Sequence, residues 1–310
     1  MNSHDSNNDE LIDPSTSSSP TSSDQQVADD DLLDCEDTSE DTNQGRAGEH
    51  DPSQKSFLLT IAYDGSKYCG WQYQPDQKSV QETLEKGLKR VFGQPVRALA
   101  SSRTDAGVHA LAQTAVIRTT AWNAPADRLP LAVNCYLPST VVVRDVRQVP
   151  NSFHPLRDSI GKRYRYQIYN SRKDDPIGNK THWWVKRRVN HDTLREAAEL
   201  LVGKHDFMSL QTSGSPRSST IRTIRSLEIT SQPHMDGQMI YLEVQADGFL
   251  YNMMRNIAGT LVQVGVGRKK PEWINEVLQA RDRQYAGQTA PPQGLFLLEV
   301  YFREGAFSLD

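Results

Sequence analysis

Hydrophobic and polar positions alternate along several stretches of the chain, and this period of two is typical of half-buried β-strands. The clearest stretch begins at residue 162, where Tyr164, Tyr166 and Ile168 alternate with arginine and glutamine. Turn residues or helical patterns bound the other strand-like stretches. These further strands are predicted over residues 57–63, 113–118, 224–229, 239–246 and 295–302.

Other stretches repeat apolar residues every three or four positions, which predicts amphipathic helices. The best-marked helix starts at Ser79, because Ser79 and Glu82 have the spacing of a capping box. Its predicted apolar face consists of Val80, Leu84, Leu88 and Val91. Further helices are predicted over residues 192–202, 250–264 and 272–280.

The order of these elements predicts an α+β fold. The strands come in runs that suit antiparallel pairing, with helices between them, and neither a GxGxxG nor a GxxxxGK motif is present. The length and pattern suit two similar α+β halves, over residues 54–152 and 153–310, preceded by a low-complexity tail over residues 1–53.

The tail differs from the rest of the chain in charge. Residues 1–50 contain 14 acidic residues and a single basic one, Arg46, so we expect this segment to be disordered. Setting them aside leaves 34 Lys and Arg against 25 Asp and Glu. This excess favours a polyanionic partner, with which the acidic tail is hypothesised to compete for the basic surface.

Several classes of protein are not expected. Cys35, Cys69 and Cys135 form no CxxC pair or Cys/His cluster, which argues against a disulfide framework or a zinc site. The first thirty residues lack the basic start and apolar core of a secretory signal, and no run approaches about eighteen apolar residues. A cytoplasmic protein without a membrane span is therefore the expectation.

The residues best suited to chemistry lie in the run Arg103-Thr104-Asp105-Ala106-Gly107-Val108-His109-Ala110, a short glycine-containing turn with one carboxylate. This run resembles the signature of the pseudouridine synthases that isomerise uridines in the anticodon arm of transfer RNA. The resemblance extends over about residues 55–303. It implies the pseudouridine synthase fold, in which two related halves with mixed or antiparallel sheets join across a central basic RNA-binding cleft.

Asp105 is the catalytic carboxylate that this resemblance implies. Forming pseudouridine breaks the bond between C1′ and N1, turns the base and rejoins it through C5, so neither a metal nor a redox cofactor is needed. The reaction needs a carboxylate that is shielded from water and acts as a nucleophile or an ion-pairing base. Whether Asp105 attacks the sugar, attacks the base or assists a glycal route stays open.

Three further residues are assigned to catalysis. Arg103 would keep Asp105 ionised or fill the gap that a flipped uridine leaves in the RNA stack. Tyr164, in the segment matching the family's RYRY, would stack on the uracil while its hydroxyl takes part in proton transfer. Arg255, in the matching segment 247–259, would reach Asp105 from the second half, because a buried carboxylate without a cation is protonated more readily.

Basic side chains supply the expected contacts with RNA. Arg163 and Arg165, together with Arg103, Tyr164 and Arg255, form the expected substrate-binding set. If about six cations met phosphates, affinity should fall by roughly three orders of magnitude between low and moderate salt. The wider set of candidates is Lys67, Arg90, Arg97, Arg163, Arg165, Lys186, Arg187, Arg188, Arg217 and Arg222.

The chain departs from the family's pattern at two positions. Ser102 replaces the glycine that usually precedes the arginine of the signature, which matters if that residue needs a left-handed backbone. Leu156 stands where the family usually has an arginine, next to Arg157.

The sequence thus predicts a tRNA pseudouridine synthase, an isomerase (intramolecular transferase) that modifies positions 38, 39 and 40 of the anticodon stem-loop. By the resemblance it needs no cofactor and works as a homodimer on tRNA. One alternative is a non-catalytic protein of the same fold that binds structured RNA, for which Asp105 would be dispensable. Another is a metal-dependent hydrolase using Asp105 and His109, although no third ligand lies nearby in the sequence.

Overall fold

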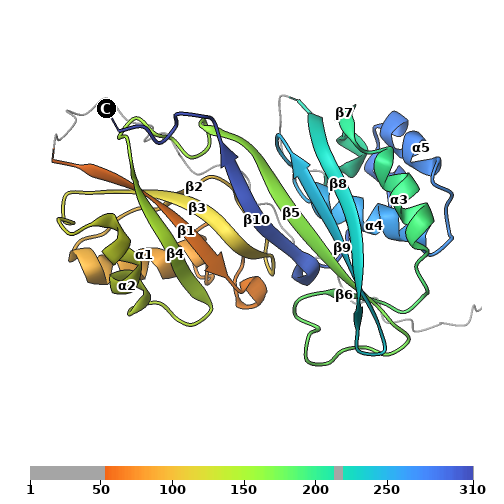
Figure 1. Cartoon of the computed structure of the whole chain (residues 1–310), viewed down its shortest axis with the longest axis horizontal. Helices are drawn as coiled ribbons and strands as arrows, with labels where there is room; N and C mark the ends of the chain where they lie inside the picture. The colour runs from red at the N-terminus through yellow and green to blue at the C-terminus, as the bar shows by residue number, and fades with distance from the viewer. Residues whose placement is uncertain (1–52, 213–218, 310) are drawn as a thin grey trace, which may run out of the picture. The chain divides into compact units, whose positions relative to one another are not determined.

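A computed structural model describes residues 53–212 and 219–309, and one large mixed sheet organises them (Figure 1). Within these residues the main path of the sheet runs β4-β1-β3-β10-β5-β9-β8-β7, while β2 pairs with β3 and β6 with β5. The strands are β1 (Lys55–Tyr63), β2 (Leu99–Ala100), β3 (His109–Thr119), β4 (Val141–Val149), β5 (Ser159–Asn170), β6 (Trp183–Val185), β7 (Gly203–Asp206), β8 (Ile221–His234), β9 (Gly237–Ala246) and β10 (Leu295–Phe302).

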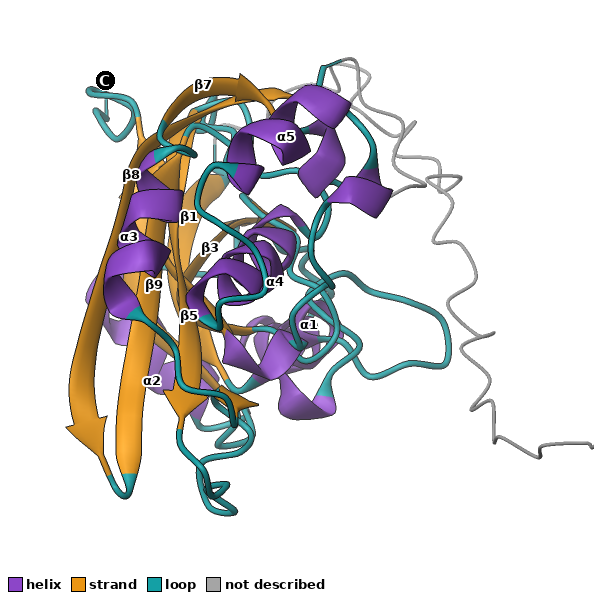
Figure 2. Cartoon of the chain, turned by 90° about the vertical axis from the view of Figure 1, so that its right-hand side faces the viewer, coloured by secondary structure: helices purple, strands orange, loops and turns teal. Residues whose placement is uncertain are grey.

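Helices cover the sheet. Figure 2 shows the strands nearly edge-on, with α1, α4 and α5 on one side of them. The α-helices are α1 (Val80–Phe92), α2 (Leu129–Asn134), α3 (His191–Glu199), α4 (Met253–Gly265) and α5 (Trp273–Ala280). Short 3-10 helices are η1 (Gly65–Lys67), η2 (Ala126–Arg128), η3 (Met208–Leu210), η4 (Arg283–Tyr285) and η5 (Pro292–Gly294). The predicted α+β class is confirmed. Among the described helices, none is long and apolar enough to cross a membrane.

The last strand joins the first and second parts of the sheet. β10 pairs in parallel with β3, where Leu297 lies opposite Ala110, and antiparallel with β5, where Leu297 lies opposite Tyr164. Ala110 directly follows the signature turn. This register therefore brings the turn beside Tyr164, a contact between segments far apart in the sequence.

Helix α1 forms where its capping signal predicts. The Ser79 side chain accepts a hydrogen bond from the Glu82 amide at 3.1 Å, and Gly93 ends the helix with a left-handed φ of 71°. Val80, Leu84 and Leu88 are buried as predicted, but Phe92 is buried in place of Val91. The reason is the helical period of 3.6 residues, which places Phe92 four positions after Leu88 on the same face.

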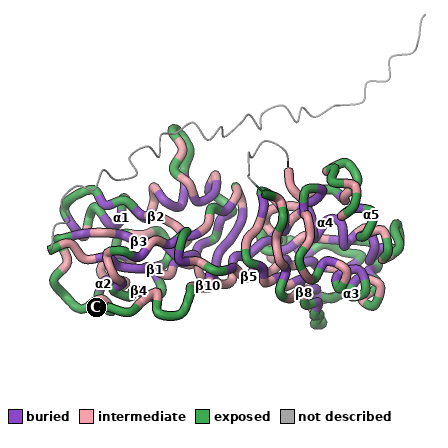
Figure 3. Tube along the Cα trace, turned by 90° about the horizontal axis from the view of Figure 1, so that it is seen from above, coloured by how far each residue is buried: buried purple, intermediate pink, exposed green. Residues whose placement is uncertain are grey.

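Helix α4 lies in the core. All of its residues except Arg255 and Gln263 are buried, and Figure 3 shows buried stretches on both sides of the β10–β5 pair. A Cβ on Gly259 would lie 1.7 Å from the Gln288 carbonyl oxygen, so the segment before β10 passes directly against this helix. The backbone amide of Ala290 also donates to the Arg255 carbonyl at 3.1 Å.

The other predicted elements exist, and β10 has the predicted bounds, while most of the rest differ by a few residues. β3 begins at His109 and β8 extends to His234, while α3 ends at Glu199, three residues short of the predicted end. Val202 is accordingly 39% exposed and not part of an apolar helical face. β4 and α2 had no predicted counterpart.

We expect Gly259→Ala to destabilise the protein by about 1–3 kcal/mol, because the added methyl would overlap the Gln288 carbonyl. Replacing glycine by alanine in a helix interior normally stabilises a protein by about 1 kcal/mol. A decrease in the free energy of unfolding would therefore indicate the steric overlap. Gly87→Ala in α1 is the matched control, since its methyl would meet only the end of the Leu137 side chain. Urea unfolding measures both variants, and equal stability of the two would contradict this packing.

Candidate active site

The signature turn connects β2 to β3 and carries Asp105 at its tip. The Val108 amide donates to the Asp105 carbonyl at 3.1 Å and closes the turn. Gly107 has a φ of +77°, a left-handed conformation that favours glycine. Its amide donates to the Tyr68 carbonyl at 3.3 Å, so the turn is tied to the segment that follows β1.

That segment supports the turn by close backbone contact. The Trp71 amide donates to the Thr104 carbonyl at 3.0 Å. A Cβ on Gly70 would lie 2.4 Å from the Thr104 oxygen, and one on Gly65 would lie 1.9 Å from the Val108 oxygen. Only glycine permits these approaches, which explains physically why glycines stand at the first residue of η1 and three residues after its end.

The Asp105 carboxylate is largely withdrawn from water. Its side chain is 31% exposed, and burial raises its pKa above the ordinary value while the Arg255 charge lowers it. At the neighbouring residue of the turn, the Tyr63 hydroxyl and Thr104 Oγ1 are hydrogen-bonded at 2.7 Å, and both residues are buried. This buried bond anchors the turn directly before Asp105.

The structure brings Arg255 to Asp105. Arg255 Nη1 lies 3.8 Å from Asp105 Oδ2, and the Arg255 side chain is 17% exposed. Its Nε donates to the Ala290 carbonyl at 2.7 Å and its Nη1 to Asn252 Oδ1 at 2.8 Å. These two bonds fix the guanidinium on the first turn of α4, so its charge stays beside the carboxylate.

Tyr164 lies next to the same turn. Its hydroxyl is 3.1 Å from Ser102 Oγ, and its ring packs edge-on against Phe249 with centroids 4.8 Å apart. Burial raises the pKa of Tyr164 to about 12, although the Ser102 hydrogen bond lowers it and the Asp105 charge raises it further. The phenol is therefore neutral near pH 7 and has a proton to donate.

Ser102 fits the turn without backbone strain. Among the described residues other than glycine, only Asp76, Met235, Asn252 and Arg281 have a positive φ. Ser102 thus adopts a conformation open to any residue, and its side chain contacts Tyr164.

Arg163 and Arg165 are not brought to Asp105. Side chains alternate between the two faces of β5, so these arginines point away from the face that holds Tyr164. Arg163 Nη2 lies 3.1 Å from Glu299 Oε2, and Arg165 Nε donates to Glu243 Oε1 at 2.8 Å. Both arginines are thus paired with carboxylates on the face of β5 opposite Tyr164, and their contact with RNA stays a prediction.

Other predicted residues are placed as follows. Arg103 is exposed at the start of the turn. Leu156 is 56% exposed, and the neighbouring Arg157 donates to the Ser152 carbonyl at 2.6 Å. Arg217 lies outside the described residues.

His109 has a structural role. Its Nδ1 accepts from the Gly65 amide at 3.1 Å, and its Nε2 lies 2.9 Å from the Lys180 carbonyl. Burial lowers the pKa of His109, so the ring is neutral and Nε2 carries the proton that Lys180 accepts. With both ring nitrogens engaged inside the protein, the hypothesis of a metal pair with Asp105 loses its second ligand.

The sequence reasoning missed Tyr166, a fully buried residue that supports the site two residues after Tyr164. Its hydroxyl donates to the Pro291 carbonyl at 2.6 Å, and burial raises its pKa far above the ordinary value. The period of two along β5 was the available signal, since Tyr166 must share a face with Tyr164. No pattern in the sequence indicated the hydrogen bond between Arg255 and Asn252.

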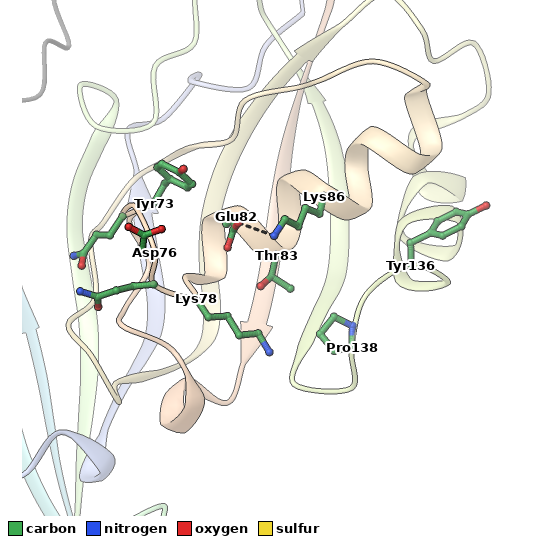
Figure 4. A pocket seen from close by; sticks show the side chains of 10 residues that line it. Tyr73, Asp76, Lys78, Glu82, Thr83, Lys86, Tyr136 and Pro138 are labelled. Atoms are coloured by element: carbon green, nitrogen blue, oxygen red, sulfur yellow. Dashed lines mark ion pairs between the residues drawn. The ribbon is translucent and has the colours of Figure 1, made fainter.

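A hollow beside α1 is a separate feature (Figure 4). Lys86 pairs there with Glu82 at 2.6 Å, and Lys78 Nζ lies 5.0 Å from the centre of the Tyr68 ring. Asp76 adds a further negative charge to the lining. Because its charges balance, this hollow has no preference for an anion, and none of Asp105, Tyr164 and Arg255 lines it.

A family model described as tRNA pseudouridine synthase matches residues 59–156 and 197–303. Asp105 lies in the first matched stretch and Arg255 in the second. The fold, the turn and this match together define an enzyme that isomerises uridine in RNA.

Curated relatives specify the family. The chain is 41% identical over 248 residues to tRNA pseudouridine synthase A of Thermoanaerobacter sp. (strain X514), covering 80% of this chain and all of the relative. The Myxococcus xanthus protein of the same name is 41% identical over 80% of this chain and 92% of its own. A solved Cbf5–Nop10–Gar1 complex matches at 10% identity over 66% of this chain and 54% of that chain, with a TM-score of 0.28, too slight a likeness to bear on function.

The chain belongs to the tRNA pseudouridine synthase A family. It is therefore an isomerase, an intramolecular transferase that converts uridine to pseudouridine in tRNA.

We expect Asp105→Asn to raise the thermal unfolding midpoint at pH 7. Since burial raises the folded-state pKa of Asp105, the folded chain favours the protonated carboxyl. That contribution to stability is fully present below the unfolded pKa of about 3.9 and is lost as pH rises through the folded pKa. The gain from asparagine should therefore be present near neutrality and disappear below about pH 4.

Calorimetry at several pH values measures this difference. Asp145→Asn is the matched control, because Asp145 is an exposed carboxylate on β4. A midpoint for Asp105→Asn at or below that of the unsubstituted protein at pH 7 would contradict a net cost of burying the charge.

Proposed function

We propose that this enzyme modifies uridines at positions 38, 39 and 40 of the anticodon stem-loop, with Asp105 as the nucleophile. The observation that carries the proposal is the withdrawn Asp105 carboxylate, held 3.8 Å from a fixed arginine. Desolvation makes the carboxylate more reactive, while the arginine keeps enough of it ionised to act.

The reaction begins with a uridine flipped out of the RNA stack. Asp105 attacks C1′, the bond to N1 breaks, and the uracil leaves with the electron pair of that bond. The detached base turns until C5 faces C1′, then forms the new bond and expels the carboxylate. C5 finally loses its proton and N1 gains one, so the product is an isomer of the substrate.

Tyr164 borders the turn that carries Asp105, and the fully buried Tyr166 lies on the same face of β5. The pKa of Tyr164 is about 12, so its hydroxyl donates a hydrogen bond at neutral pH. We assign Tyr164 to stacking against the turning base and to donating to one of its oxygens. The neutral phenol is a poor base, so the acceptor of the C5 proton is another group.

Two arginines act beside the base. Arg255 balances the charge of Asp105 before attack and after release, since its hydrogen bonds to Ala290 and Asn252 hold it in place. Arg103 is exposed two residues before Asp105, and we assign it to the gap that the flipped uridine leaves. Arg163 and Arg165, on the opposite face of β5, are assigned to contacts with the RNA away from the reacting base.

The broader organisation is part of the same proposal. Residues 54–152 form a half that supplies Asp105, and residues 153–310 form a half that supplies Tyr164 and Arg255. Family membership supports a cytoplasmic homodimer that binds tRNA across both subunits and needs no cofactor. The pairing of β10 with both β3 and β5 supports a site assembled from the two halves.

Transcripts of one tRNA with uridine at only one of positions 38, 39 and 40, and cytidine at the other two, test the assignment of position. We expect pseudouridine at each of the three, read by mass spectrometry of nuclease fragments. A transcript with cytidine at all three, but with its T-arm uridines intact, is the control and should stay unmodified. Product only outside the anticodon arm would contradict the proposal.

A further inference from the structure

A cluster of exposed basic side chains lies at the end of α4 opposite to Arg255. One segment, Lys186 to Arg188, follows β6, and the other, Arg268 to Lys270, follows α4. The Asn190 amide donates to the Gly265 carbonyl at 2.7 Å and ties the two segments together. A hollow, here named the α4 basic hollow, is lined by Arg188, Val189, Asn190, His191, Asp192, Thr193, Val264, Gly265, Val266, Gly267, Arg268, Lys269, Lys270 and Pro271.

The charge of this surface is not balanced within the described chain. None of the six cations forms an ion pair with a carboxylate of residues 53–212 or 219–309. Lys269 Nζ lies 5.0 Å from the centre of the Trp273 ring, and Arg268 Nη1 donates to Gln263 at 3.4 Å. Asp192, the one carboxylate in the lining, pairs at 3.3 Å with Arg195. The hollow beside α1 differs in this respect, because its Lys86 forms an ion pair with Glu82.

The hollow has a fixed separation from the active site. Arg255 lies in the first turn of α4 and Gly265 is its last residue, ten positions later, which is about 15 Å along a helix. Because α4 is buried along almost its whole length, this separation cannot change without unpacking the core. The hollow therefore lies about 15 Å along α4 from Arg255, the residue that pairs with Asp105, which is less than the roughly 34 Å of one turn of a nucleic-acid duplex.

We propose that the α4 basic hollow binds phosphates of the substrate tRNA, in the stem that carries the modified uridine. Unpaired cations on exposed backbone segments suit a phosphate backbone, which needs charge and no base recognition. The proposal rests on the assignment to the anticodon arm made above. It gives the enzyme a second contact on the same stem, set at a fixed distance from Asp105 by α4.

The test removes two cations of the lining, with Arg188→Gln and Lys270→Gln made together in an Asp105→Asn background, where the proposed mechanism predicts no turnover. Fluorescence anisotropy then measures the affinity for tRNA and for the isolated anticodon stem-loop over a range of salt. We expect about tenfold weaker binding at low salt and a slope of log affinity against log salt that is smaller by about 2, for both RNAs.

A matched control removes the same charge elsewhere. Lys86 and Lys173 are exposed lysines that pair with Glu82 and Asp236, and Lys86→Gln with Lys173→Gln should change affinity less than twofold. Thermal unfolding confirms that each variant folds.

Three outcomes would overturn the proposal. The first is an affinity for tRNA that is unchanged, with an unchanged salt slope, or that becomes tighter. Tighter binding is the result expected if the hollow held the chain's own acidic tail. The second is a loss equal to that of the control pair, which would reflect net charge alone. The third is a loss for whole tRNA but not for the stem-loop, which would place the contact on another arm. The anisotropy experiment measures only binding. If the uridine positions proposed above are wrong, that error will appear in the mass-spectrometry mapping of the transcripts and not in this experiment.

Discussion

The placement of β10 between β3 and β5 is the constraint on which the site depends. One residue, Leu297, lies opposite Ala110 on one side and Tyr164 on the other. Without this strand, the turn that carries Asp105 and the strand that carries Tyr164 would belong to separate sheets. The segment leading into β10 also accepts a hydrogen bond from Arg255 through Ala290, so the same connection positions the cation.

The electrostatics of the site follow from that placement. Burial disfavours the charged form of Asp105, and Arg255 opposes this effect from 3.8 Å away. Arg255 can do so steadily because Asn252 and Ala290 hold its guanidinium and because α4 is locked against residue 288 by Gly259. The environment of the Asp105 carboxylate is thus set partly by packing around α4, and burial of its charge costs some stability.

Local signals in the sequence predicted much of the fold. The capping box at Ser79 and the alternation through Tyr164 correctly located α1 and β5, since both depend on residues close in the chain. The pairing of β10 could not be predicted in this way, because parallel and antiparallel partners are chosen by the whole sheet. The α+β fold class, by contrast, could be predicted from the order of strands and helices along the chain.

The candidate site was only partly accessible to sequence reasoning. The meeting of Asp105 with Arg255 came from the family resemblance, as an isolated arginine on a helix carries no sign of its partner. The RNA contacts of Arg163 and Arg165 stay a prediction, although the alternation of side chains along a strand already indicated that both face away from Tyr164. Ser102 shows the reverse, since only the structure reveals that its hydroxyl reaches Tyr164.

Release of tritium from C5 of uridine in labelled tRNA tests the central claim most directly, because C5 loses its hydrogen only if the base is rearranged. The account predicts release by the unsubstituted enzyme and none by Asp105→Asn, although both bind the tRNA. Release by Asp105→Asn at the unsubstituted rate would contradict the role given to this carboxylate and to the packing that surrounds it.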